Sequence, residues 1–281
     1  TIDFKDWIGG GGEGAVYGGT YAGLRVAIKR RQVNNEDDAK SIFRETRILQ
    51  AARFKHIVMA YGVAIKDASL DNAMQTFIVM ERCLHGSLKN FLPSASPDNL
   101  QSPDGQRELQ RRCALAFGDP DALPAYSATS LRLVRELLAA LHWIHSRGFV
   151  HRDLKPDNLL IAIDGSLRLS DFGASASVNT LNTHSRRTAV GTPLYFAPEQ
   201  LQYEMQIKDS RATDIYVFGL IAAQLFSDRP PVDASVLDGI AAGMQQLSIL
   251  KGLVVEKGYR PWGPAMPAVF AAPSSPSSAI S

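Results

Sequence analysis

The sequence predicts an α+β protein whose first part is rich in strands and whose second part is mainly helical. The first eighty residues contain short apolar stretches separated by Gly, Asn and Asp, a pattern typical of an antiparallel sheet. After residue 130, apolar side chains recur at helical spacing over long segments. A chain of 281 residues is long enough for one large domain or for two lobes.

Composition and charge restrict the class of protein. Hydrophobic residues make up 45% and charged residues 21%, the balance of a soluble globular protein with a real core. The net charge of +2 does not indicate nucleic-acid binding or a polybasic membrane anchor. No apolar run approaches the roughly 20 residues of a membrane span. Cys83 and Cys113 are too few for a disulfide framework or a zinc cluster, so we expect free thiols and an intracellular, cytoplasmic setting.

The first part is expected to form a small antiparallel sheet with one helix against it. The predicted strands lie around Phe4–Ile8, Ala15–Tyr17, Val26–Ile28, Val63–Ile65 and Phe77–Met80. Between the third and the fourth strand, residues 37–54 repeat apolar side chains at helical spacing, and Glu45 lies among them. This arrangement would place one helix in the middle of the first eighty residues.

The second part begins with an irregular stretch. Residues 93–130 carry five prolines and little periodicity, which predicts an exposed insertion with one helical turn around Gln106–Leu115. A long helix is expected at 130–148, with Ser130 as its N-cap and Gly148 as its stop. The remaining expected elements are helices at Asp214–Phe226 and Val236–Leu250 and a flexible tail, rich in Pro, Ser and Ala, at 263–281.

Residues 9–19, GGGGEGAVYGG, hold seven glycines in eleven positions. Glycine suits a linker and equally a backbone shaped to lie against a ligand, because it has no Cβ. Gly9, Gly11 and Gly14 fit the pattern G-x-G-x-x-G, which is weak on its own. A strand-like segment follows in place of the helix that a dinucleotide-binding turn requires. These residues alone leave both the linker and the ligand loop open.

Two later motifs carry more chemical information. Lys29 ends the apolar stretch VAIK and is either a solvated strand end or a point charge for phosphate, which Glu45 could hold in place. HRDLKPDN contains Asp153, Lys155 and Asn158, and Asp171 opens DFG after a predicted strand-turn-strand. Oxygen ligands from Asn158 and Asp171 suit Mg²⁺. Asp153 could accept the proton of an attacking hydroxyl.

Together these motifs resemble the catalytic domain of eukaryotic protein kinases. The segments stand in the family's order: G-x-G-x-x-G-x-V at 9–16, VAIK at 26–29, HRDLKPDN at 151–158, DFG at 171–173 and APE at 197–199. The resemblance covers residues 4–262 and implies the α+β, bilobal protein-kinase fold, with a sheet N-lobe carrying one helix and a larger helical C-lobe. The implied domain is 1–262, with the N-lobe at 1–80, the hinge at 81–83, the C-lobe at 84–262 and the tail at 263–281.

The C-lobe departs from the family pattern near its end. In the family, a late Arg pairs with the glutamate of APE, which here is Glu199. No Arg follows Arg260 in this sequence. Either Arg260 takes that part or the C-lobe is truncated and Glu199 lacks its partner, and the sequence context favours the truncation. Breaking such a buried pair costs about 3–5 kcal/mol.

The resemblance implies a role for each motif residue. The nucleotide-binding residues would be Ile8, Gly9, Gly11, Gly14, Val16, Ala27, Lys29, Met80, Glu81, Cys83 and Leu160, with the glycines over the ATP phosphates and Val16 and Ala27 beside the adenine. Lys29, steadied by Glu45, would hold the α- and β-phosphates. Asp153 would act as the catalytic base and Lys155 would neutralise the transferred phosphoryl group. Asn158 and Asp171 would hold Mg²⁺.

Smaller features of the sequence suggest the substrate class. Lys155 follows Asp153 by two residues, as in serine/threonine-specific members, and GTPLYFAPE at 191–199 resembles their peptide-docking segment. We therefore expect Mg-ATP-dependent phosphorylation of serine and threonine in protein substrates, within intracellular signalling. The glycine-rich loop, GSLKNFL and GYRP resemble the tyrosine-kinase-like branch.

Other interpretations stay open at this stage. A pseudokinase or scaffold that binds nucleotide without phosphoryl transfer is one alternative, and a small-molecule kinase is another. A phosphate in the segment Asp171–Glu199, for which Thr188 is favoured, could pair with Arg152 and order that segment. A mobile loop that is merely rich in Ser and Thr is the plainer interpretation. The oligomeric state and the pathway are not predicted.

Overall fold

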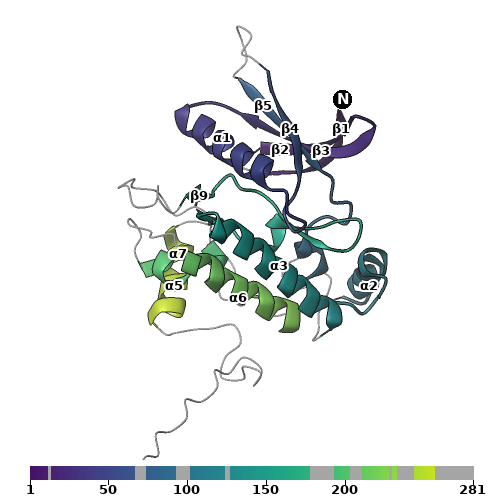
Figure 1. Cartoon of the computed structure of the whole chain (residues 1–281). Coiled ribbons are helices and arrows are strands. Elements are labelled where there is room, and N and C mark those ends of the chain that lie inside the picture. Colours follow the sequence, from purple (N-terminus) through teal and green to yellow (C-terminus); the bar gives the residue numbers. More distant parts are fainter. Residues whose placement is uncertain are drawn as a thin grey trace, which may run out of the picture.

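The structure, a computed structural model, describes the chain in nine ranges. These are residues 1–11, 14–66, 74–92, 102–123, 127–177, 193–202, 211–227, 230–232 and 244–256. They form a strand-rich N-lobe with one helix, lying against a helical C-lobe (Figure 1). This arrangement confirms the predicted α+β, two-lobed fold. The predicted tail at 263–281 lies outside the described ranges, as do Gly12, Thr192, Thr188 and Arg260.

Five antiparallel strands build the N-lobe sheet. They are β1 (Ile2–Gly11), β2 (Gly14–Tyr21), β3 (Leu24–Gln32), β4 (Ala60–Lys66) and β5 (Gln75–Glu81), in the spatial order β1-β2-β3-β5-β4. Burial alternates along β5, as expected for a strand with one face on the core. The described residues of the glycine-rich stretch, 9–11 and 14–19, belong to the paired strands β1 and β2, and Gly11 lies opposite Gly14. These residues are therefore part of the sheet, and the linker interpretation is wrong.

Helix α1 (Glu36–Ala51) lies between this sheet and the C-lobe (Figure 1). Asn35 caps it, because its side-chain oxygen accepts a hydrogen bond from the Asp38 backbone nitrogen. Three acidic residues in the first turn stabilise the helix, because their negative charge lies at the positive end of the helix dipole. The buried face consists of Ile42, Glu45, Ile48 and Leu49. The helix predicted at 37–54 is therefore present, with a carboxylate on its buried face.

The described C-lobe centres on two long helices, α3 (Ala128–Ser146) and α6 (Arg211–Ser227), which contact each other (Figure 1). Short strands pair beside them: β6 (Phe149–Val150) with β9 (Ala176–Ser177), and β7 (Leu159–Ile161) with β8 (Leu167–Leu169). The shorter helices are η1 (Leu88–Phe91), η2 (Pro156–Asn158), η3 (Pro193–Tyr195), α5 (Pro198–Gln202), α7 (Met244–Lys251) and η5 (Gly252–Glu256). Among the residues with a described placement, no helix has the length and apolar character of a membrane span.

The predicted start of α3 is corrected by three residues. Ser127, and not Ser130, is the N-cap, and the Ser127 hydroxyl oxygen accepts a hydrogen bond from the Ser130 backbone nitrogen. Ser130 is fully buried and donates its hydroxyl to the Leu225 carbonyl on α6. At the other end Gly148 has φ of 77°, a conformation that glycine adopts without strain, so the predicted stop is correct.

The described part of the insertion contains a longer helix than the sequence suggested. In place of one turn, residues 103–117 form α2 (Pro103–Phe117), a helix of 15 residues. Ser102 caps its start, and Gly118 ends it with φ of 74°. Leu109, Cys113 and Ala116 are buried on one face. Their spacing of four and three residues was the signal for this helix, but the surrounding prolines hid it.

One apolar core runs through both lobes. It joins Ile48 and Ile78 of the N-lobe to Leu137 and Phe172 of the C-lobe, all at most 1% exposed. The segment after α1 completes the connection, because His56 and Val58 exchange backbone hydrogen bonds with Leu169 of β8 at 2.9 and 3.0 Å. The lobes are therefore held together by packing as well as by the chain crossing between β5 and η1.

Glycine has different importance at different positions of the β1–β2 hairpin. Gly14 has φ of 128°, and a Cβ there would collide with the Arg30 carbonyl oxygen. A Cβ on Gly10 would lie 3.2 Å from the Gly14 oxygen, which is tight and argues against free substitution at Gly10. A Cβ on Gly9 would have nothing within 4 Å.

We predict that Gly14→Ala destabilises the fold and that Gly9→Ala does not. The strained backbone and the collision should lower the melting temperature of Gly14→Ala by about 4–8 °C. Gly9→Ala is the matched control, because it adds the same methyl group to the same hairpin in open space. Thermal unfolding followed by circular dichroism measures both. Equal melting temperatures for the two variants would contradict the strained geometry at Gly14.

Candidate functional site

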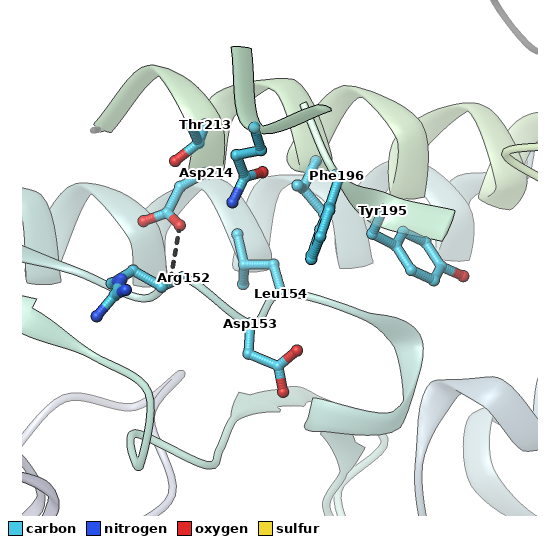
Figure 2. A pocket seen from close by; sticks show the side chains of 9 residues that line it. Arg152, Asp153, Leu154, Tyr195, Phe196, Thr213 and Asp214 are labelled. Carbon is cyan, nitrogen blue, oxygen red and sulfur yellow. Dashed lines mark hydrogen bonds between the residues drawn. The ribbon is translucent and has the colours of Figure 1, made fainter. Parts of the chain in front are cut away.

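A buried carboxylate holds the loop that contains HRD. Asp214 of α6 is 2% exposed and accepts hydrogen bonds from the backbone nitrogens of His151 and Arg152 at 2.8 and 3.0 Å. His145 on α3 adds its ring nitrogen Nε2 at 2.8 Å. Figure 2 shows Asp214 reaching from α6 to the backbone at Arg152. A single side chain therefore fixes the loop relative to both long helices.

The same loop is tied to the segment that contains DFG. Arg152 has φ of 75°, a left-handed conformation that costs a non-glycine residue about 1–3 kcal/mol. Its guanidinium donates to the Ala174 carbonyl at 3.1 Å. His151 is fully buried, lies 3.0 Å from the Ser170 carbonyl and contacts the Phe172 ring. His151 and Phe172 thus have packing positions in this structure.

Asp153 is held through one of its two oxygens. Its Oδ2 accepts hydrogen bonds from Lys155 Nζ at 2.8 Å and from Asn158 Nδ2 at 3.0 Å. Its Oδ1 is buried and has no hydrogen-bond partner among the described residues. In Figure 2 the carboxylate points away from Asp214 and α6. A buried acceptor without a hydrogen-bond partner lowers the stability of the fold. Here this oxygen is held in a fixed position, where it can accept a hydrogen bond from a proton donor.

A second charge cluster lies where the N-lobe meets DFG. Lys29 Nζ is 2.8 Å from Glu45 Oε1 and 2.7 Å from Asp171 Oδ1. Burial of the Lys29 ammonium opposes its charge, but the two carboxylates outweigh burial and raise its pKa. Glu45 is 1% exposed, whereas the Asp171 side chain is 28% exposed. The cluster therefore has a fully buried side and a side that reaches solvent.

The placement of Asn158 and Asp171 follows from one strand pair. Asn158 directly precedes β7, Asp171 lies two residues after β8, and Leu159 pairs with Leu169. The Asn158 side chain uses its amide nitrogen to donate hydrogen bonds to the Asp153 backbone oxygen and to Asp153 Oδ2. The Asn158 amide oxygen and the Asp171 carboxylate are oxygen donors that suit Mg²⁺. Among the residues that the structure places, no group of three or more His, Cys, Asp or Glu forms a metal cluster.

The apolar side chains expected at the nucleotide site come from both lobes and adjoin one core. Ala27 and Met80 of the sheet belong to the main apolar core, and Val16 of β2, Cys83 after β5 and Leu160 of β7 pack against it. Ala27 and Met80 are buried, and the other three are partly exposed. The expected nucleotide-binding residue Ile8 lies apart from this group. It is 43% exposed, and the pairing of β1 with β2 shifts register around it.

Ion pairs that the sequence did not reveal surround the chain crossing. The Glu81 carboxylate lies 3.2 Å from the Arg168 guanidinium of β8. The Asp6 carboxylate of β1 pairs with the Arg82 guanidinium. The Glu81 backbone nitrogen donates to the Met59 carbonyl at 2.8 Å. These pairs join elements far apart in the sequence, so no local pattern could identify them.

We predict that Asp214→Asn destabilises the protein through the HRD loop. The substituted amide presents one acceptor to two buried backbone donors, which should lower the free energy of unfolding by about 2–3 kcal/mol. Urea denaturation measures the change. Asp164→Asn is the matched control, since Asp164 also accepts a backbone hydrogen bond, from Ser166, but is 49% exposed at its side chain. Similar losses in both variants would contradict the role assigned to Asp214.

We predict that the Cys83 thiol reacts slowly with alkylating reagents. Burial, together with the charge of Glu81, raises the pKa of Cys83 to about 12, so the thiol is protonated at neutral pH. In a Cys113→Ser background, the iodoacetamide rate should rise about tenfold per pH unit above about pH 8. Mass spectrometry follows the modification, and the denatured protein serves as the reactive control. A rate that levels off near pH 9 would contradict this environment.

Comparisons with known proteins agree with the motif order and with this geometry. A protein kinase domain profile matches residues 2–262. Serine/threonine-protein kinase 4 homolog B of Dictyostelium discoideum is 29% identical over 232 residues, which cover 82% of this chain and 18% of the relative. Serine/threonine-protein kinase pakC of the same organism is 30% identical over 227 residues, covering 80% and 40%. Serine/threonine-protein kinase STE20 of Saccharomyces cerevisiae is 28% identical over 226 residues, covering 80% and 20%.

The matched relatives are longer proteins, and this chain spans between about a fifth and two fifths of their length. Assignment to the tyrosine-kinase-like branch stays a prediction, since these relatives carry other kinase names. The profile covers almost the whole chain, and the relatives share one class of name. The chain therefore belongs to the protein kinase family, and its domain is of the serine/threonine type.

Proposed function

We propose that this domain transfers the γ-phosphate of Mg-ATP to serine and threonine hydroxyls of protein substrates. The main observation in support of the proposal is the hydrogen bonding of the two Asp153 carboxylate oxygens. One oxygen is held by Lys155 and Asn158, and the other is buried without a partner among the described residues. A fixed carboxylate oxygen of this kind is what general-base catalysis at a hydroxyl requires.

The nucleotide would bind between the lobes. Its adenine would lie among Val16, Ala27, Met80 and Leu160, all of which belong to the apolar core of both lobes or pack against it. The Glu81 nitrogen and the Cys83 carbonyl already bond to Met59 and Gly86, so the Glu81 carbonyl and the Cys83 nitrogen are the groups proposed for the adenine edge. Gly9, Gly11 and Gly14 would bring the hairpin backbone close to the phosphates. Ile8 of β1, which is 43% exposed, would contact the nucleotide from the sheet side.

Charged residues would hold and neutralise the phosphates. Lys29 is held at hydrogen-bond distance by Glu45 and would meet the α- and β-phosphates as a point charge. Asn158 and Asp171 fit Mg²⁺ as oxygen donors, and the Asp171 side chain lies on the solvent-reaching side of the cluster. Magnesium bound there would neutralise charge on the phosphates and orient them.

The transfer step can be written with these residues. The substrate hydroxyl gives its proton to Oδ1 of Asp153 as its oxygen bonds to the γ-phosphorus. The bond from the γ-phosphorus to the bridging oxygen breaks, and ADP leaves. Lys155 lies 2.8 Å from Asp153 Oδ2, so its charge would sit beside the transferred group. Positioning and charge neutralisation supply most of the rate in such chemistry.

Substrate identity and setting are further parts of the proposal. Protein substrates are supported by the names of three relatives, which are serine/threonine-protein kinases. An intracellular signalling role is consistent with two free cysteines, of which Cys113 is buried. A scaffold that binds nucleotide without transfer is the competing interpretation, and nothing in the placement of Lys29, Glu45 or Asp153 favours it.

We predict that Asp153→Asn lowers phosphate transfer by about 10²–10⁴-fold while nucleotide binding is kept. Transfer is measured with labelled ATP and a generic basic protein, and binding is measured by calorimetry with Mg-ADP. Asp157→Asn is the matched control, because Asp157 belongs to the same motif but pairs with Lys89 at the surface. Equal transfer by wild type and Asp153→Asn would refute the catalytic role. Nucleotide binding without transfer in the wild type would establish the scaffold.

A further inference from the structure

The buried carboxylate of Glu45 is held by two cations. Lys29 Nζ lies 2.8 Å from its Oε1, and Arg31 Nη1 lies 3.2 Å from its Oε2. The side chain of Glu45 is 1% exposed, that of Lys29 8% and that of Arg31 11%. The two cations alternate on β3 with Arg30 between them, so both face α1. The Lys29 pair follows from the family motif, whereas no motif singled out Arg31.

Arg31 contacts more than Glu45. Its Nη1 also lies 3.4 Å from the Ser41 hydroxyl, one turn earlier on α1. Ser41 in turn donates its hydroxyl to the Gly173 carbonyl at 2.8 Å. A Cβ on Gly14 would lie 3.0 Å from the Arg31 Cγ, so the aliphatic stem of Arg31 lies against the glycine-rich hairpin. Arg31 therefore joins the hairpin, α1 and the DFG backbone.

The net charge of this cluster explains why Glu45 needs a second cation. Lys29 is shared between two carboxylates, Glu45 and Asp171, and these three groups alone carry a net negative charge. Arg31 balances that charge at the most buried carboxylate. Removing the cation from a buried ion pair leaves an uncompensated charge, which is strongly unfavourable. When Lys29 turns toward phosphate, Arg31 would still hold Glu45 in place.

The neighbouring residue Arg30 shows that charge on β3 is not enough for this role. Its guanidinium lies over the Tyr17 ring, 5.8 Å from the ring centre, on the face of β3 away from Glu45. Arg30 and Arg31 thus carry the same side chain on adjacent positions of one strand. Only Arg31 reaches α1, which makes Arg30 a natural control.

We propose that Arg31 is a positioning residue that anchors α1 by holding Glu45 from the side opposite Lys29. It would act through Glu45 and Ser41, the side chains that its guanidinium contacts. The anchor itself is independent of catalysis, whereas its effect on turnover rests on the proposed kinase activity. Two measurements on the whole chain separate these parts.

The first measurement is hydrogen exchange of the α1 amides in nucleotide-free protein. Arg31→Met keeps the aliphatic stem and removes the charge, and Arg30→Met removes the same charge on the opposite face. Exchange across α1 should be about tenfold faster in Arg31→Met and unchanged in Arg30→Met. Arg31→Lys should restore part of the protection. In a Lys29→Met background, Arg31 is the remaining cation at Glu45. Adding Arg31→Met there should increase the exchange rate by a larger factor than Arg31→Met does in the wild-type background.

The second measurement is steady-state kinetics with varied ATP. If Arg31 acts by positioning α1, kcat should fall about tenfold in Arg31→Met with little change in KM for ATP, and Arg31→Lys should recover activity. Unchanged α1 exchange in Arg31→Met, in both Lys29 and Lys29→Met backgrounds, would overturn the proposal. Equal effects of Arg30→Met and Arg31→Met would overturn it as well. An inactive wild type with the expected exchange pattern would refute the proposed function and leave the anchor standing.

Discussion

The buried carboxylate of Glu45 is the constraint on which the N-lobe depends. A charge that is 1% exposed is tolerated only with cations and hydrogen bonds around it. Lys29 and Arg31 on β3 supply these cations, and their reach sets the position of α1 against the sheet. Because Lys29 also bonds Asp171, the same pair sets the distance between the sheet and the DFG segment.

A second buried carboxylate organises the C-lobe in a similar way. Asp214 holds the backbone of His151 and Arg152, and this loop then presents Asp153 on its other side. Each lobe thus uses one buried acid to fix a functional element, which is α1 in the N-lobe and the HRD loop in the C-lobe. Such acids are costly when unpaired, so the geometry around them has few alternatives. The segment at 52–58, which follows α1, connects the N-lobe to the C-lobe through backbone hydrogen bonds to Leu169 of β8.

The sequence predicted the strands, α1 and the long helices well, because hydrophobic periodicity is local information. It underestimated α2, where Leu109, Cys113 and Ala116 form a buried face between proline-rich flanks. The predicted cap of α3, Ser130, was three residues too late, because both Ser127 and Ser130 suit an N-cap locally. Only packing decides between them, because Ser130 is buried against the Leu225 carbonyl of α6.

By itself the sequence determined the fold class, the order of the motifs and the identity of the charged residues at the site. These follow from residue type and spacing, which the chain carries without folding. Only the tertiary structure decided that Arg31 shares Glu45 with Lys29, that Asp214 supports the HRD loop and that one oxygen of Asp153 is left without a partner among the described residues. Burial and the contact of distant segments create these interactions. A charge needs a partner only after folding has removed water from it, because the desolvation penalty is otherwise uncompensated.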